Sequence, residues 1–253
     1  MKHKPKVHVI TLGCAKNLVD SESLLGQFRS NAVEIVPSIE DADVAIINTC
    51  GFIEASKAES IGTILETAQL KSTGSLKKVF VMGCLSQRYS ADLAHELPEI
   101  DGFFGVNEHQ KVLAELGSDL KYNLVGERVL TTPPHYAYLK ISEGCNHPCS
   151  FCAIPLIRGK YMSKPVEQIL SEAKGLAQGG VKELILIAQD STYYGIDITR
   201  KRELPALLEK LAEIDGIDWI RLMYAYPTNF PLGILDVMVD NPKICRYIDM
   251  PVQ

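Results

Sequence analysis

Short runs of apolar, often β-branched residues alternate along the chain with longer segments whose apolar positions recur at helical spacing. Such alternation is typical of parallel α/β architecture, in which a helix follows each strand and covers the sheet. In the first half it predicts strands at residues 7–12, 33–36, 44–48, 79–82 and 102–105, and helices at residues 21–29, 56–70, 90–96 and 108–116. Asp20 and Ser21 are suitable N-cap residues for the first of these helices. The first half is therefore predicted to be a doubly wound domain around a five-stranded parallel sheet.

The alternation restarts in the second half, after a break that ends in Pro133 and Pro134. Consecutive prolines favour an extended connector, so we place a domain boundary between residues 1–130 and residues 135–253. The second domain is predicted to contain strands at residues 137–142, 183–188, 219–224 and 247–251, and helices at residues 166–177, 204–214 and 232–239. Four βα-type units in succession indicate the first part of a (β/α) barrel.

Four parallel strands cannot close a barrel, and they leave an apolar edge exposed. We therefore expect the sequence to be the N-terminal part of a longer protein, with a barrel that is incomplete at its C-terminus. The start of the chain lacks the apolar core of a secretory signal, and no apolar run approaches the roughly 20 residues that cross a bilayer. A soluble, cytoplasmic protein without membrane contact is expected.

The net charge of −5 argues against a broad nucleic-acid surface, which needs clustered Lys and Arg, and fits a basic protein partner. The seven cysteines are more informative. In a reducing cytosol, cysteines at ordered spacings are metal ligands or catalytic groups more often than disulfides. Six of them fall into two sets of three. The seventh, Cys245, precedes the last predicted strand and is expected to be a buried free thiol.

The local triad, Cys145, Cys149 and Cys152, has the spacing CxxxCxxC directly after a predicted strand. Three thiolates can bind three irons of a 4Fe–4S cube and leave the fourth iron open to the amine and carboxylate of S-adenosylmethionine (SAM). The alternative is a zinc knuckle, but structural zinc normally takes four ligands in paired CxxC spacing. No second pair lies nearby, and His147 sits inside the tight loop with poor reach. The pattern favours an open iron–sulfur cluster.

The dispersed triad, Cys14, Cys50 and Cys84, follows three separate predicted strands, in the contexts VITLGC, AIINTCG and VFVMGC. In a sheet of flavodoxin-like order the first, third and fourth strands are neighbours, and ligands lie at their carboxyl ends. A glycine adjoins each cysteine and permits close approach of the backbone to a cofactor. Three buried free cysteines are the alternative. Their matched positions favour a second cluster.

With both triads placed, nearly the whole chain resembles the radical SAM methylthiotransferases. The resemblance rests on the segments GCAKNLVDSE, NTCGFIEASKAES, GCLSQRY and YLKISEGCNHPCSFCAIPLIRG. Phe151 is the aromatic residue that usually precedes the last cysteine of the motif, which places it beside the cofactor. Family members combine an N-terminal auxiliary-cluster domain with a radical SAM barrel and usually a C-terminal TRAM domain, which is absent from these 253 residues.

The resemblance implies two 4Fe–4S clusters and two uses of SAM. In one, the methyl group passes to a sulfur on the auxiliary cluster, held by the dispersed triad. In the other, an electron from the cluster on the local triad cleaves SAM to a 5′-deoxyadenosyl radical, and flavodoxin or ferredoxin is the kind of donor that supplies it. A radical is needed because the target carbon has no useful acidity toward a base of ordinary pKa.

Two segments, KNLVDSE (residues 16–22) and QDSTYYG (residues 189–195), resemble the branch that modifies the β-carbon of an aspartate in ribosomal protein uS12. A tRNA methylthiotransferase acting on a modified adenosine is the alternative within the same chemistry, and it alone implies nucleic-acid contact. A non-catalytic metal-binding module is the alternative of another class. The chain departs from the family at Lys164, where the family often has arginine.

Further candidates near SAM are less specific. Arg158 could pair with a carboxylate or steady charge near the sulfonium, or it could form an ion pair within its loop. Gln189 and Asp190 end the second barrel strand, where barrel active sites lie, and could hold the amino group of SAM or cap a turn. Tyr224 and Tyr226 end the third strand and are expected to pack.

Overall fold

The computed structural model describes residues 5–74, 76–121 and 127–251. The chain divides into two compact units, Met1–Leu124 and Val125–Gln253, which are described separately. The break predicted to end at Pro133 and Pro134 follows residues 122–126, which lie outside the described residues. Within the described residues, no helix combines the length and the apolar character that a membrane span needs.

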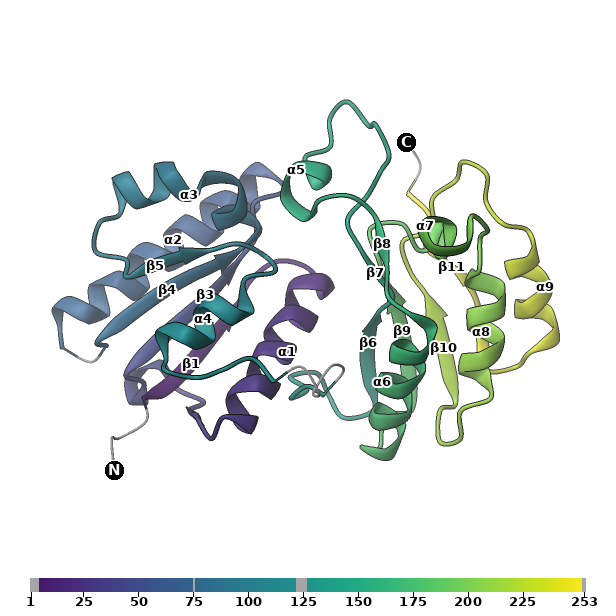
Figure 1. The fold of residues 1–253 in the computed structure, drawn as a ribbon, viewed down its shortest axis with the longest axis horizontal. Helices are drawn as coiled ribbons and strands as arrows, with labels where there is room; N and C mark the ends of the chain where they lie inside the picture. The colour runs from purple at the N-terminus through teal and green to yellow at the C-terminus, as the bar shows by residue number, and fades with distance from the viewer. Residues whose placement is uncertain (1–4, 75, 122–126, 252–253) are drawn as a thin grey trace. The chain divides into compact units, whose positions relative to one another are not determined.

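Unit 1 contains a parallel sheet with the strand order β2-β1-β3-β4-β5. Its strands are β1 (Lys6–Thr11), β2 (Glu34–Ile35), β3 (Val44–Thr49), β4 (Lys78–Gly83) and β5 (Gly102–Phe104). The helices are α1 (Ala15–Ser30), α2 (Glu54–Ser72), α3 (Cys84–Glu96) and α4 (His109–Glu115), with a 3-10 turn η1 (Ile39–Asp41). Helices lie on both faces of the sheet (Figure 1), and the central strand β3 is buried throughout. The predicted doubly wound sheet is confirmed.

The start of α1 differs from the prediction. The helix begins at Ala15 with Cys14 as N-cap, so Asp20 and Ser21 lie inside it and are buried. The Ser21 hydroxyl accepts hydrogen bonds from Thr11 Oγ1 (2.7 Å) and Asn48 Nδ2 (2.9 Å). The predicted N-cap was wrong because these polar residues form a buried, hydrogen-bonded helix face, which resembles a cap in sequence.

The start of α3 was also predicted too late. This helix begins at Cys84, directly after Gly83, whose φ of +98° ends strand β4 sharply. Tyr89 has non-helical φ and ψ inside α3, so the predicted helix at residues 90–96 corresponds only to the part after this kink. A cysteine of the dispersed triad is therefore the N-cap of α1 and the first residue of α3.

Unit 2 contains a second parallel sheet, in which strands follow one another in chain order. Its strands are β6 (Tyr136–Lys140), β9 (Glu183–Ile187), β10 (Trp219–Leu222) and β11 (Ile244–Ile248). The connecting helices are α6 (Val166–Gln178), α8 (Leu204–Ala212) and α9 (Gly233–Asp240), packed in succession along the sheet (Figure 1). Right-handed crossovers that always advance in one direction produce this arrangement. The prediction of a partial (β/α) barrel is confirmed.

Shorter elements of unit 2 were not predicted. They are the antiparallel pair β7 (Ser142–Glu143) and β8 (Met162–Ser163), the helices α5 (Ile154–Arg158) and α7 (Ile196–Thr199), and the 3-10 turn η3 (Ser191–Tyr193). Strand β11 begins three residues earlier than predicted, so Cys245 lies within the strand and not before it. The start of β11 is set by its pairing with β10, because the first paired residues of the two strands are Ile220 and Ile244. Cys245 is a free thiol but is only partly buried, not buried as expected, because alternate residues of an edge strand face away from the core. This partial burial is the main cause that raises the pKa of its thiol.

Candidate functional site

The dispersed triad lies at the carboxyl edge of the first sheet. Cys14 precedes α1, Cys50 directly follows β3, and Cys84 begins α3 directly after β4. Strand β3 pairs with both β1 and β4, so the three strands are adjacent. The three cysteines, each of which follows one of these strands, therefore lie at the same edge of the sheet. Cys14 is exposed, whereas Cys50 and Cys84 are buried. One thiol of the triad is therefore open to solvent and two face protein.

The glycines beside the cysteines show how closely the three loops approach. Gly13 has a φ of +87°, and a Cβ placed there would lie 2.6 Å from Cys50 Cβ and 3.0 Å from Cys50 Sγ. A Cβ on Gly51 would lie 2.8 Å from Leu85 Cα and 3.3 Å from the carbonyl carbon of Cys84. Since no side chain fits between neighbouring loops, glycine is required at both contacts.

Asn17 joins the three loops through its fully buried carboxamide. Its Nδ2 donates to the carbonyl oxygens of Leu12 (3.0 Å) and Thr49 (2.9 Å), which precede the first two cysteines of the triad by one or two residues. The Cys84 thiol donates to Asn17 Oδ1 (3.4 Å). Sequence reasoning did not single out Asn17, although it belongs to the KNLVDSE segment. The feature that could have identified Asn17 is its side-chain amide in the first helical turn after a cysteine.

The local triad lies in the loop between β7 and α5. Cys145 N donates to Gly159 O and Cys152 N to Cys149 O, both at 3.1 Å. All three cysteines line one pocket, together with His147, Ile154, Gln189, Tyr224, Ala225, Tyr226 and Pro251. Burial is the main cause that raises the pKa of the Cys145 thiol, opposed by the hydrogen bond from the backbone N–H of His147.

His147 anchors this loop to the barrel strands. Its ring stacks on Tyr226 with centroids 3.9 Å apart, and its Nε2 lies 2.7 Å from Asp190 Oδ2. The Tyr226 hydroxyl lies 3.8 Å from Cys149 Sγ, and this contact is the first cause that raises the pKa of Tyr226. Tyr224 has a φ of +60° and also lines the pocket. Tyr226 packs as expected, against His147, and both tyrosines also line the pocket.

Within the described residues, no group of three or more His, Cys, Asp or Glu side chains is arranged to hold a single metal ion. That geometry is the one a zinc knuckle needs, since its ligands share one tetrahedral ion. The thiolates of a 4Fe–4S cube each bind a different iron and therefore stand further apart.

Gln189 lines the pocket of the local triad, and its two amide atoms differ in their surroundings. Nε2 donates to Glu143 Oε1 at 2.9 Å, whereas Oε1 is buried and has no hydrogen-bond partner among the described residues. A carboxylate only accepts hydrogen bonds, so the nitrogen of the amide must face Glu143. A buried acceptor without a partner is costly, and a bound donor such as an ammonium group would satisfy it.

Asp190 is engaged on both carboxylate oxygens. Oδ1 accepts from Thr192 N (2.8 Å) and Thr192 Oγ1 (2.6 Å), and Oδ2 contacts His147. The aspartate thus caps the turn after β9 and holds the local-triad loop. It is absent from the pocket lining described above. Of the two alternatives considered from the sequence, turn capping is the one with observed contacts.

Arg158 and Phe151 do not line the pocket in the described part of the chain. Arg158 is buried, and its NH1 lies 3.1 Å from Glu143 Oε2 in an ion pair within the same segment of the barrel. Phe151 lies on the loop with 72% of its surface exposed.

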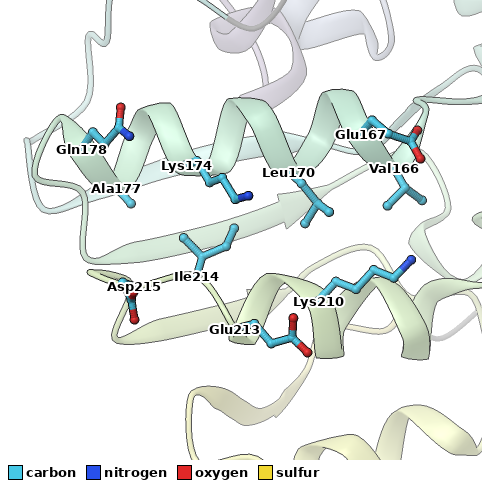
Figure 2. A pocket seen from close by; sticks show the side chains of 10 residues that line it. All are labelled: Val166, Glu167, Leu170, Lys174, Ala177, Gln178, Lys210, Glu213, Ile214 and Asp215. Carbon is cyan, nitrogen blue, oxygen red and sulfur yellow. The ribbon is translucent and has the colours of Figure 1, made fainter.

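A second hollow of unit 2 lies between α6 and α8. Figure 2 shows that Lys174 and Lys210 project into it among Glu167, Glu213 and apolar side chains. The charges are of both signs, and the lining residues include no cysteine or histidine. The chemistry-bearing pocket of this unit is therefore that of the local triad.

Two family models match different parts of the chain. Residues 6–105 match the uncharacterised protein family UPF0004, and residues 139–253 match the radical SAM superfamily. Two relatives, from Cytophaga hutchinsonii and Flavobacterium johnsoniae, are both named ribosomal protein uS12 methylthiotransferase RimO. They are 56% identical over 252 and 253 residues, which cover 99% of this chain and 58% of each relative. The chain thus spans little more than half the length of these curated relatives.

Among solved structures, the radical S-adenosylmethionine methyltransferase TsrM from Kitasatospora setae, with cobalamin and a [4Fe-4S] cluster bound, has a TM-score of 0.67. It is 12% identical, and the match covers 98% of this chain and 61% of that chain. This likeness concerns the fold.

Proposed function

Since this chain belongs to the radical SAM methylthiotransferase family, we propose that the protein it represents adds a methylthio group to the β-carbon of an aspartate in ribosomal protein uS12. One observation carries the proposal: two cysteine triads lie in two separate units, in a chain aligned over 99% of its length with proteins of that name. A ribosomal substrate places the reaction in the cytoplasm.

Each of the two units holds one of the two clusters. Residues 1–130 form the auxiliary-cluster domain, in which the dispersed triad holds a second 4Fe–4S cluster. Residues 135–253 form the first part of the radical SAM barrel. Membership of the radical SAM superfamily means a 4Fe–4S cluster and SAM, and the local triad holds that cluster. When bound, these groups supply an electron, a carbon-centred oxidant and a sulfur atom, which proton transfer alone cannot provide.

The residues of the local-triad pocket fit SAM. Three thiols on one wall leave one iron of a cube without a protein ligand, as chelation by an amino acid group requires. Gln189 lines the same pocket, and its buried Oε1, an acceptor without a partner among the described residues, is the atom we assign to the ammonium group of SAM. The apolar wall at Ile154 and Ala225 excludes water from a reactive intermediate.

Other residues of the barrel act by holding these groups. Asp190 and His147 join the cluster loop to the end of β9 through their 2.7 Å contact. Arg158 supports Glu143 through their ion pair. Phe151 is exposed on the cluster loop, directly before Cys152. A flavodoxin or ferredoxin is the class of partner that delivers the electron.

The test begins with anaerobic reconstitution of the chain. Two cubes predict about eight irons per chain, whereas a structural zinc site predicts roughly one zinc. Formation of 5′-deoxyadenosine from SAM under reducing conditions then separates an enzyme from a non-catalytic metal-binding module.

The substrate requires the full-length protein. Mass spectrometry should find one methylthio group, in place of a hydrogen, on the aspartate of a uS12 peptide. The same group on a modified adenosine of tRNA, with none on the peptide, would assign the protein to the tRNA-modifying branch and contradict the proposal.

A further inference from the structure

Glu143 is a buried carboxylate at the end of β7, two residues before the first cysteine of the local triad. Its Oε2 accepts from Lys140 Nζ (2.8 Å) and Arg158 NH1 (3.1 Å). Its Oε1 accepts from Gln189 Nε2 (2.9 Å) and Gly144 N (3.2 Å). One side chain thus connects the ends of β6, β9 and α5 with the start of the cluster loop.

These contacts determine what Gln189 offers to the pocket. The two cations occupy Oε2, so the carboxylate turns Oε1 toward Gln189, and this oxygen can only accept a hydrogen bond. The amide nitrogen of Gln189 must therefore face Glu143, and its oxygen is the end that is left without a partner among the described residues. A flipped amide would set two acceptor oxygens against each other.

We propose that Glu143 is a positioning residue that makes the pocket select a ligand carrying a hydrogen-bond donor. By fixing the Gln189 amide, it presents an acceptor and not a donor to the ammonium group of SAM. The inference rests on the function proposed above, because SAM is the ligand it concerns. Glu143 itself does not line the pocket in the described residues, so it acts through Gln189.

Glu143→Gln is the informative substitution. The new amide keeps the size of the side chain but can donate or accept, so Gln189 is free to flip and to present its Nε2. We expect SAM to bind the reconstituted variant about tenfold more weakly than wild type, as loss of a hydrogen bond to a charged group predicts. A desamino analogue of SAM, in which hydrogen replaces the amino group, should bind both proteins equally. Isothermal titration under anaerobic conditions measures all four affinities.

Glu172→Gln is the matched control. Glu172 is another buried carboxylate of the barrel, paired with Lys164 (2.7 Å) and Arg128 (3.4 Å), and none of the three lines the pocket. This variant should lose a comparable part of its thermal stability while its affinity for SAM stays at the wild-type value. Iron content, measured on every sample, shows that the clusters are retained.

A double-mutant cycle with Gln189→Leu tests whether Glu143 acts through Gln189. In the Gln189→Leu background, Glu143→Gln should produce no further loss of SAM affinity. Equal weakening of SAM and its desamino analogue, or a full additional loss in the Gln189→Leu background, would show a general structural role and overturn the inference. If iron-loaded wild type bound no SAM at all, the proposed function would fail first, and this inference with it.

Discussion

The local triad lies within a single loop, whereas the dispersed triad comes from three loops that meet at one edge of a parallel sheet. Covalent spacing alone keeps Cys145, Cys149 and Cys152 close together. Cys14 and Cys84 come together with Cys50 only when β1, β3 and β4 pair. One site is therefore local in sequence and the other depends on the whole fold of its unit.

The difference shows in how each site is supported. Around the dispersed triad, the loops approach so closely that glycines and the Asn17 amide occupy the contacts. Around the local triad, side chains from several strands hold one loop, through His147 and Glu143. Because metal binding is coupled to folding wherever the site is absent from the unfolded chain, loss of stability in unit 1 should directly weaken binding of the cluster proposed for it.

The largest effect is expected from removing one ligand of each triad. Cys149→Ser and Cys50→Ser should each reduce the iron content from about eight to about four per chain. Cys149→Ser should abolish 5′-deoxyadenosine formation, whereas Cys50→Ser should retain it. Iron analysis and chromatography of the SAM products measure both. Retention of SAM cleavage by Cys149→Ser would break the assignment of the two roles.

The second largest effect is expected from a substitution that crowds the loops of the dispersed triad. Gly13→Ala should lower the free energy of unfolding by about 3 kcal/mol, since its φ is +87° and the new Cβ meets Cys50 at 2.6 Å. Denaturant unfolding of the apoprotein and iron content after reconstitution measure the result, and only the auxiliary cluster should be lost.

Gly74→Ala is the control for this variant, because Gly74 has a φ of +88° with no atom within 4 Å of the added Cβ. It should cost about 1 kcal/mol. Equal destabilisation by the two substitutions would mean that backbone conformation, and not close approach of the loops, sets the requirement for glycine at position 13.

Removal of the amide that joins the loops should cost somewhat less. Asn17→Ala leaves the carbonyls of Leu12 and Thr49 without their donor, and we expect a loss of about 2 kcal/mol with weaker loading of the auxiliary cluster. Asn31→Ala, at the exposed end of the same helix, is the comparison and should cost under about 1 kcal/mol. Similar unfolding curves for both variants would contradict a joining role for Asn17.

The smallest effect concerns the local triad. Tyr226→Phe removes a hydroxyl 3.8 Å from Cys149 Sγ but keeps the ring that stacks on His147. A donor to a cluster sulfur stabilises the more negative, reduced cluster, so its loss should lower the reduction potential by the equivalent of about 1 kcal/mol. A potentiometric titration followed by electron paramagnetic resonance measures it. Tyr193→Phe, whose ring meets His147 edge-on, should leave the potential unchanged.

Sequence reasoning found the strands well, because buried parallel strands are short, uniform apolar runs between turns. It failed where polar residues are buried. Asp20 and Ser21 were placed at a helix start although they lie inside α1, where Thr11 and Asn48 satisfy Ser21. The β7–β8 pair was missed because two-residue strands carry no periodicity.

At the two sites, sequence reasoning likewise found some of the important residues and missed others. The cysteines stood out because thiols at ordered spacings are rare. Asn17 and Glu143 did not, since nothing in their own segments shows that Thr49 or Gln189 lies within hydrogen-bond distance.

The sequence by itself determined the order of strands and helices, the spacing of the local triad and the position of a cysteine after each of three strands. These properties follow from side-chain periodicity and covalent distance, which act within a few residues. Only the tertiary structure decided that β3 lies between β1 and β4, and that the amide nitrogen of Gln189 donates to Glu143. Pairing of strands and of buried polar groups depends on partners distant in the chain, so it is settled only when the chain is packed.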